Sequence, residues 1–123
     1  MSGILKLVPA DVRRWVNTTK WSIEGLITAW KEEKSLRQWI IVNAISWVAI
    51  VLVGFSSGEA GLLVALGVLV VIVELLNSAV ETCVDYVSTD HHPLAKKAKD
   101  IASAAVFVSA LLWGGVWVLL LAA

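Results

Sequence analysis

The stretch Leu62-Leu-Val-Ala-Leu-Gly-Val-Leu-Val-Val-Ile-Val73 contains no polar side chain, and it continues into Glu74-Leu-Leu-Asn-Ser-Ala-Val-Glu-Thr-Cys-Val-Asp85, where polar residues recur at helical spacing. A helix needs about 20 mostly apolar residues to cross the ~30 Å hydrocarbon core of a bilayer. The segment from about residue 61 to residue 87 reaches that length. It therefore predicts a membrane-spanning helix.

Two further apolar segments flank this one, at about residues 36–55 and 101–121. The chain has 123 residues, of which 59% are hydrophobic, and this length allows one domain at most. The sequence thus predicts an all-α integral membrane protein that forms a single domain over residues 1–123. Because three helices can hardly bury a polar face alone, we also expect a homo-oligomer.

The basic residues are unevenly distributed around the three predicted spans. Of the ten Lys and Arg residues, seven lie before or at the beginning of the first span and three (Lys96, Lys97 and Lys99) precede the third. The segment between the first two spans carries only Glu59. By the positive-inside rule the N-terminus is cytoplasmic and the C-terminus lies outside. This pattern predicts a multi-pass membrane protein.

The segment from about residue 9 to residue 31 is amphipathic. Its apolar residues, among them Val12, Trp15 and Ile23, recur at helical spacing, and basic residues such as Arg13 and Lys20 take the opposite face. Helices of this kind lie in the membrane interface with their cations near the lipid phosphates. We expect a surface helix here.

Five polar residues of the central span share one helical face, since they are spaced three or four residues apart: Glu74, Asn77, Ser78, Glu81 and Asp85, hereafter the polar stripe. An acid near the bilayer centre costs about 2.5–3.5 kcal/mol on insertion scales, which makes it a functional-site hypothesis by default. Counted at ~1.5 Å per residue from Leu62, Glu74 lies ~12 Å inside the cytoplasmic boundary and Glu81 level with it. The stripe could therefore meet a lipid at one end and a water-soluble reactant at the other.

The residues along the stripe suit proton abstraction from an alcohol, cation binding and phosphate binding. A sheltered carboxyl such as Glu74 suits a general base, and Glu81 suits a hard cation such as Mg²⁺. Asn77 could bind a phosphate or orient a carboxylate, and Lys99 offers a cation for phosphate. Pro93 suits a first helical turn, with Thr89 or Asp90 as possible caps.

Other interpretations of the same residues stay open at this point. A lone intramembrane Glu is often a structural hydrogen-bond partner, so a non-enzymatic membrane scaffold or channel-like oligomer would also use such a stripe. The sequence has no phosphate-binding loop, no dinucleotide fingerprint and no zinc-protease motif. Because the basic residues are juxtamembrane, no nucleic-acid partner is indicated.

Two strings, Val73-Glu-Leu-Leu-Asn-Ser-Ala-Val-Glu81 and His91-His-Pro-Leu-Ala-Lys-Lys-Ala-Lys-Asp100 with the following Ala102-Ser-Ala-Ala105, closely resemble the small bacterial membrane diacylglycerol kinases, a family that includes undecaprenol kinases. The resemblance covers nearly all of the chain. It implies a homotrimer of three-helix subunits with an N-terminal surface helix. It also implies transfer of the γ-phosphate of ATP to a lipid alcohol, with Mg²⁺ and with sites formed between subunits.

The resemblance also implies roles for particular residues. Glu74 matches the family's general base, and Glu33 and Glu81 match its metal-binding carboxylates. Further positions match residues around ATP, besides the two metal-binding glutamates: Arg14, Trp21, Asn77, Asp90, His91, His92, Lys99 and Asp100. On the lipid side the matching positions, besides Glu74, are Gln38, Trp39 and Ser103.

One position departs from the family pattern. Diacylglycerol-specific members have Glu after the Arg-Gln that corresponds to Arg37-Gln38, whereas this chain has Trp39. An aromatic ring thus replaces a charge near the lipid hydroxyl. The expected reaction yields phosphatidic acid from diacylglycerol, and the alternative within the same family is an undecaprenol kinase.

Overall fold

The computed structural model describes residues 9–123, and these residues form helices and short connections only. The helices, in chain order, are α1 (Ala10–Glu32), α2 (Lys34–Val53), α3 (Ser57–Val87) and α4 (Pro93–Ala122). The chain forms two compact units, one containing α1 and the other comprising Glu33–Ala123. Helices α2, α3 and α4 are each long and apolar enough to cross a membrane. The predicted all-α fold with three spans is confirmed.

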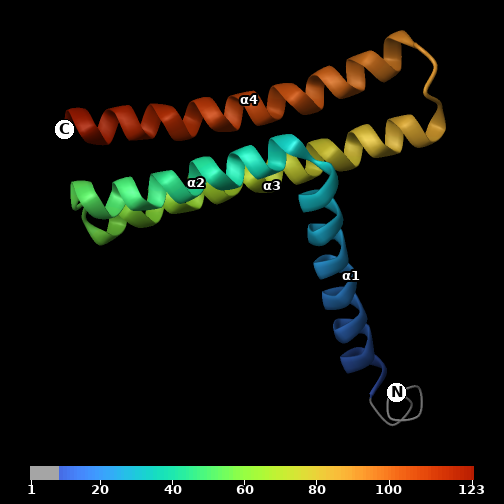
Figure 1. Ribbon diagram of the computed structural model, residues 1–123, viewed down its shortest axis with the longest axis horizontal. Coiled ribbons are helices and arrows are strands. Elements are labelled where there is room, and N and C mark those ends of the chain that lie inside the picture. The colour runs from blue at the N-terminus through green and yellow to red at the C-terminus, as the bar shows by residue number, and fades with distance from the viewer. Residues whose placement is uncertain (1–8) are drawn as a thin grey trace. The chain divides into compact units, whose positions relative to one another are not determined.

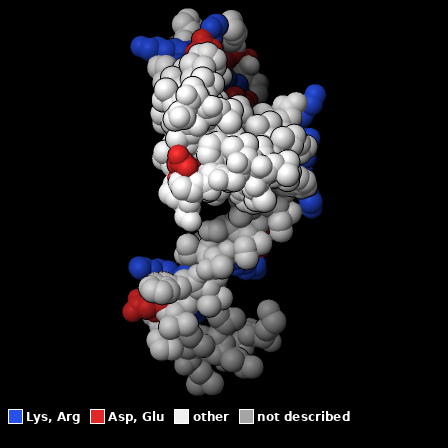
Figure 2. Space-filling view, turned by 90° about the vertical axis from the view of Figure 1, so that its left-hand side faces the viewer, with Lys and Arg blue, Asp and Glu red and all other residues white. Residues whose placement is uncertain are grey.

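Within the second unit, consecutive helices run antiparallel, and α3 packs against both α2 and α4 (Figure 1). The α2–α3 turn and the end of α4 lie at one end of this bundle (Figure 1). Seen toward that end, the surface is almost uncharged, and Lys and Arg side chains appear only at its margins (Figure 2). Lys34 and Arg37 lie at the beginning of α2 and three lysines at the beginning of α4, whereas the opposite ends of these two helices carry no Lys or Arg.

The α2–α3 turn is defined by a glycine and a capping box. Gly54 adopts a left-handed conformation (φ 77°) and its N–H donates to the Ile50 carbonyl at 3.2 Å. Ser56 Oγ accepts from the Glu59 N–H at 3.4 Å, and a Glu59 carboxylate oxygen accepts from the Ser56 N–H at 2.9 Å. These reciprocal bonds satisfy donors at the beginning of α3. As a result α3 begins at Ser57, four residues before the span predicted from residue 61.

Replacing Ser56 with Ala should destabilise the protein by about 1 kcal/mol, because the first turn of α3 loses the acceptor of its capping box. Thermal unfolding in detergent micelles measures the change. Ser57→Ala is the matched control, since Ser57 is the exposed neighbour inside the helix. Equal melting temperatures for the two variants would contradict the capping role of Ser56.

Helix α4 begins earlier than the apolar pattern suggests, at Pro93, and its N-cap is His92. His92 Nδ1 accepts from the Leu94 N–H at 3.1 Å. The sequence offers Thr89 or Asp90 as a possible cap, and neither is the N-cap. The Asp90 N–H instead donates to Ser88 Oγ at 3.0 Å within the loop, and proline at the first helical position puts the N-cap at the residue directly before it.

Few side chains are buried within a single chain. The apolar core consists of Ile50, Leu63, Val70, Val106 and Trp113. Many large apolar side chains face outward, and none of the residues of α1 is buried. Such exposure would be costly in water but suits a surface covered by lipid or by other subunits.

A close junction joins α2, α3 and α4 in the middle of the bundle. Asn43 Nδ2 donates to the carbonyl oxygens of Trp39 and Gly67, both at 3.0 Å. A Cβ added at Gly67 would lie 2.3 Å from Asn43 Oδ1 and 2.7 Å from Trp113 Cζ2. Glycine is therefore required at this position by the space between helices, although its φ is ordinary.

Candidate active site

The polar stripe lies along α3 and becomes more exposed toward the C-terminal end of that helix. Glu74 and Ser78 are buried, Asn77 and Glu81 are half-buried, and Asp85 is exposed. Glu74 is only 4% exposed in a chain that buries few residues of any kind. The stripe therefore runs from the packed interior of the bundle to its polar end, as the spacing predicts.

Glu74 contacts the beginning of α2. Ser35 Oγ donates a hydrogen bond to Glu74 Oε1, and Ser35 lies in the first turn of α2, two residues after its N-cap Glu33. Glu74 thus lies level with the first turn of α2. Because α3 has 31 residues and α2 only 20, the last turns of α3 extend past the beginning of α2 (Figure 1).

Sequence reasoning missed Ser35. A single serine near the end of an amphipathic segment carries no spacing signal, and its partner is 39 residues away. Only the packing of α2 on α3 brings the two side chains together.

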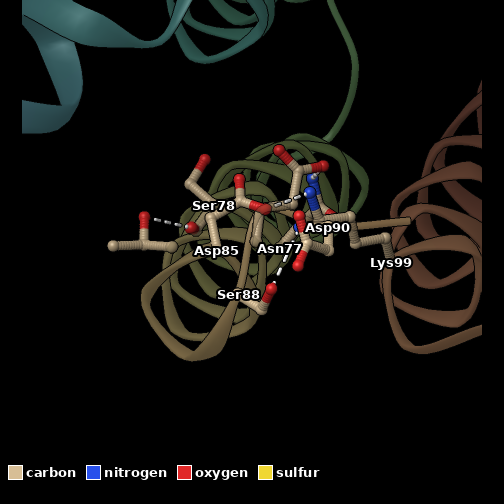
Figure 3. A network of polar contacts seen from close by, with 8 residues as sticks. Asn77, Ser78, Asp85, Ser88, Asp90 and Lys99 are labelled. Atoms are coloured by element: carbon tan, nitrogen blue, oxygen red, sulfur yellow. Dashed lines mark hydrogen bonds and ion pairs between the residues drawn. The ribbon is translucent and has the colours of Figure 1, made fainter. Parts of the chain in front are cut away.

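Asn77 and Glu81 form the next part of the stripe. Asn77 Nδ2 donates to Glu81 Oε1 at 3.3 Å, as their i, i+4 spacing allows (Figure 3). Asn77 Oδ1 is buried and has no hydrogen-bond partner among the residues that the structure describes. Asn77 also lines a groove of about 370 Å³ between α3 and α4, whose other lining residues are apolar, for example Val73 and Ala102. The amide oxygen is therefore an unused acceptor beside a carboxylate.

Lys99 on α4 connects to the end of the stripe. Its Nζ lies 2.6 Å from Asp85 Oδ1, an ion pair that links α4 to α3 across the loop (Figure 3). Lys96 forms a second pair with Asp100 one turn along α4. Both pairs are largely exposed, and exposed pairs typically contribute only about 0–1 kcal/mol to stability. These cations could therefore exchange their carboxylate partners for another anion at little cost.

A polar pocket, hereafter the loop pocket, lies where the α3–α4 loop folds beside these lysines. It has a volume of about 100 Å³, and its charged and imidazole side chains come from Asp85, Asp90, His91, His92, Lys96 and Lys99. A larger neighbouring cavity of about 550 Å³ shares Asp90 and both histidines with it and adds apolar side chains such as Val87 and Leu94. Four of the residues predicted to surround ATP (Asp90, His91, His92 and Lys99) thus lie around one pocket.

Other predicted site residues lie elsewhere in the chain. Arg14 and Trp21 are exposed on α1, within the other compact unit. Glu33 is the half-buried N-cap of α2. Among residues 9–123, no three or more His, Cys, Asp or Glu side chains lie close enough together to hold a metal ion. The predicted metal ligands Glu33 and Glu81 therefore do not belong to such a group.

The predicted lipid-side residues are also spread over two helices. Gln38 is exposed on α2, and Ser103 is exposed on α4. Trp39 lines a groove of about 430 Å³ between α2 and α4 together with Trp113 and Trp117. The departure from the family pattern at Trp39 therefore contributes to an aromatic, apolar groove.

Comparison with known proteins agrees with the resemblance. The family model described as prokaryotic diacylglycerol kinase matches residues 20–121. A diacylglycerol kinase of Pseudomonas aeruginosa is 43% identical over 98 residues, which cover 80% of each chain. One of Helicobacter pylori is 42% identical over 79% of this chain and 76% of its own, and one of Escherichia coli is 33% identical over 88% of each. The chain therefore belongs to the prokaryotic diacylglycerol kinase family and is a membrane-embedded lipid kinase.

Proposed function

We propose that the protein transfers the γ-phosphate of ATP to the hydroxyl of diacylglycerol and so forms phosphatidic acid. The observation that carries the proposal is the continuous stripe on α3, which has a buried carboxyl, Glu74, at one end and the loop pocket at the other. A lipid hydroxyl and a nucleotide can approach such a stripe from the membrane and from water, respectively. The names of the relatives in Pseudomonas aeruginosa and Helicobacter pylori support diacylglycerol as the acceptor.

Glu74 is the group we assign to the lipid hydroxyl. Its carboxyl accepts the hydroxyl proton as the lipid oxygen attacks the γ-phosphorus, and ADP leaves in line. Enzymatic phosphoryl transfer depends mainly on positioning and on neutralising charge, so a small site is adequate for it. Glu74 is sheltered from solvent, which suits a positioned base.

The residues present fit a magnesium ion bound with the nucleotide. Mg²⁺ prefers oxygen ligands and is usually held by one or two carboxylates together with substrate phosphates. Glu81 would supply one carboxylate, beside the unpaired Asn77 Oδ1, and Glu33 would supply the second. When bound, the ion would neutralise the charge that develops on the transferring phosphoryl group.

The loop pocket is the proposed binding region for the nucleotide. Lys99 releases Asp85 and binds a phosphate, while Asp90, His91 and His92 line the pocket. We assign Asp100 of α4 to the same nucleotide region. By the family resemblance we also assign Arg14 and Trp21 of α1 to ATP. On the lipid side we assign Gln38, Trp39 and Ser103.

We also propose a homotrimer with sites formed between subunits, in the bacterial inner membrane with a cytoplasmic N-terminus. One observation supports assembly: the apolar side chains left exposed in one chain. The distribution of Lys and Arg supports the orientation.

Trp39 favours a second acceptor, undecaprenol. Its ring lines an apolar groove at a position where diacylglycerol-specific relatives are expected to carry Glu. A long apolar polyprenol chain would pack more favourably in such a groove than beside a charged side chain.

Purified protein in mixed micelles tests these alternatives through ATP consumption and radiolabelled phosphate transfer. We expect turnover with diacylglycerol, loss of turnover when EDTA removes Mg²⁺, and recovery when Mg²⁺ is restored. Turnover with undecaprenol but not with diacylglycerol would identify undecaprenol as the acceptor. If folded, oligomeric protein consumed no ATP with either lipid, the kinase proposal would be wrong and a scaffold or channel-like role would gain support.

A further inference from the structure

The contact between Ser35 and Glu74 has no assigned role in the chemistry proposed above. Ser35 Oγ donates to Glu74 Oε1, and this bond joins the first turn of α2 to the middle of α3. Glu74 is 4% exposed, so water has little access to replace a lost donor. A buried carboxyl left without its partner is costly, and its orientation is no longer defined.

The local structure around Ser35 makes its hydroxyl a rigid donor. The Arg37 N–H donates to the Glu33 carbonyl at 3.4 Å, which begins the hydrogen bonding of α2. Leu36, directly after Ser35, is 2% exposed and anchors this turn in the bundle. A serine has a single side-chain rotor before its hydroxyl, so ordering it costs little entropy. The donor is therefore held in position by the helix rather than by solvent.

We propose that Ser35 is a positioning residue, whose hydroxyl holds one oxygen of Glu74 so that the other oxygen faces the hydroxyl of the lipid acceptor. This inference rests on the proposed function, in which Glu74 is the base. A carboxylate oxygen that already accepts a hydrogen bond from Ser35 has less capacity for a second donor. The lipid hydroxyl therefore donates to the other oxygen, Oε2. Because catalytic geometry must be held closely, losing such a bond slows the chemical step more than it weakens substrate binding.

The same bond relates the two carboxylates of the proposed site. Glu33, a proposed metal ligand, lies two residues before Ser35 and is the N-cap of α2, with an extended backbone (φ −97°, ψ 107°). Holding Ser35 against Glu74 therefore also restricts where Glu33 can lie relative to Glu74. Ser35 links the proposed base on α3 to the beginning of the helix next to the proposed metal ligand.

The test compares Ser35→Ala, Ser35→Thr and the control Ser46→Ala in full-length protein with diacylglycerol and MgATP. Ser46 is a buried serine of α2, whereas Ser35 is half-buried, and the Ser46 Oγ accepts from Trp117 Nε1 at 3.1 Å. It therefore loses a helix-to-helix hydrogen bond of the same kind, away from Glu74. The measurements are kcat, KM for each substrate and the thermal unfolding temperature.

We expect Ser35→Ala to lower kcat by about tenfold or more, the range for one hydrogen bond to a charged group, with little change in KM for MgATP. Threonine retains the hydroxyl, so Ser35→Thr should recover most of the lost kcat. Ser46→Ala should lower the unfolding temperature. Because Ser46 lines the groove of Trp39, any kinetic change should fall on KM for the lipid, without the loss of kcat expected for Ser35→Ala.

Several outcomes would overturn the proposal. One is a wild-type kcat in Ser35→Ala, and another is a rise in KM for the lipid alone, which would make Ser35 a lipid ligand. A loss of kcat that threonine does not restore, or that Ser46→Ala reproduces, would reduce Ser35 to a packing role. If Glu74→Gln abolished turnover but Ser35→Ala kept the wild-type rate, the proposed function would stand and this inference would be wrong.

Discussion

Glu74→Gln should reduce lipid phosphorylation by about 10²–10⁴-fold, the usual contribution of a positioned general base. The amide has nearly the shape of the carboxyl but cannot take up the proton of a lipid hydroxyl. The fold should persist, because Gln Oε1 can still accept from Ser35 Oγ, the partner of Glu74 in the wild type. The measurement is phosphate transfer from radiolabelled ATP to diacylglycerol in mixed micelles.

Glu59→Gln is the matched control for this variant. Glu59 lies in the first turn of the same helix, at the opposite end from the polar stripe, and its side chain closes the capping box with Ser56. Glutamine serves in a capping box as glutamate does, so neither fold nor turnover should change much. Near-normal turnover in Glu74→Gln would remove the base assignment, whereas loss of turnover in both variants would indicate a general sensitivity of α3 to amide substitution.

Gly67→Ala should destabilise the protein by about 1–3 kcal/mol or more, the usual cost of overpacking a filled site. The added methyl carbon would lie 2.3 Å from Asn43 Oδ1 and 2.7 Å from a ring carbon of Trp113, and neither contact is tolerable. Asn43 cannot rotate away without losing its bonds to the carbonyl oxygens of Gly67 and Trp39. Unfolding of the purified protein by heat or by SDS in mixed micelles measures the loss.

Gly115→Ala provides the control for the glycine substitution. No atom lies within 4 Å of a Cβ at Gly115, so this variant should be neutral or slightly stabilising, since alanine favours helix by about 1 kcal/mol over glycine. Equal stability of Gly67→Ala and Gly115→Ala would show that α2 and α4 do not approach α3 as closely as the junction requires.

Local patterns were sufficient to predict the helices. Residues 62–73 lack polar side chains, and a mostly apolar segment of about 20 residues or more around such a run crosses a bilayer as a helix, which satisfies its own backbone hydrogen bonds. The boundaries were less accurate, because caps depend on individual side chains. His92 rather than Thr89 or Asp90 caps α4. Helix α3, whose N-cap is Ser56, begins at Ser57, four residues earlier than its apolar segment suggests.

Part of the candidate site could also be predicted from spacing alone. Asn77 and Glu81 are four residues apart on one helix, so their contact follows from helical geometry. The approach of Lys99 to Asp85 is different, because it depends on how the loop returns α4 along α3. Helical spacing places Lys99 and Asp85 each at the polar end of its helix, but it does not predict that the two side chains form an ion pair.

The sequence by itself determined the three spans, the amphipathic segment and the polar stripe, since these depend on composition and on a period of 3.6 residues. The tertiary structure alone decided the level of Glu74, its bond to Ser35 and the junction of Asn43 with Gly67. These contacts join residues 24 and 39 positions apart, on different helices. Their geometry depends on the relative shift of α2 along α3, which side-chain packing sets and which no local pattern encodes.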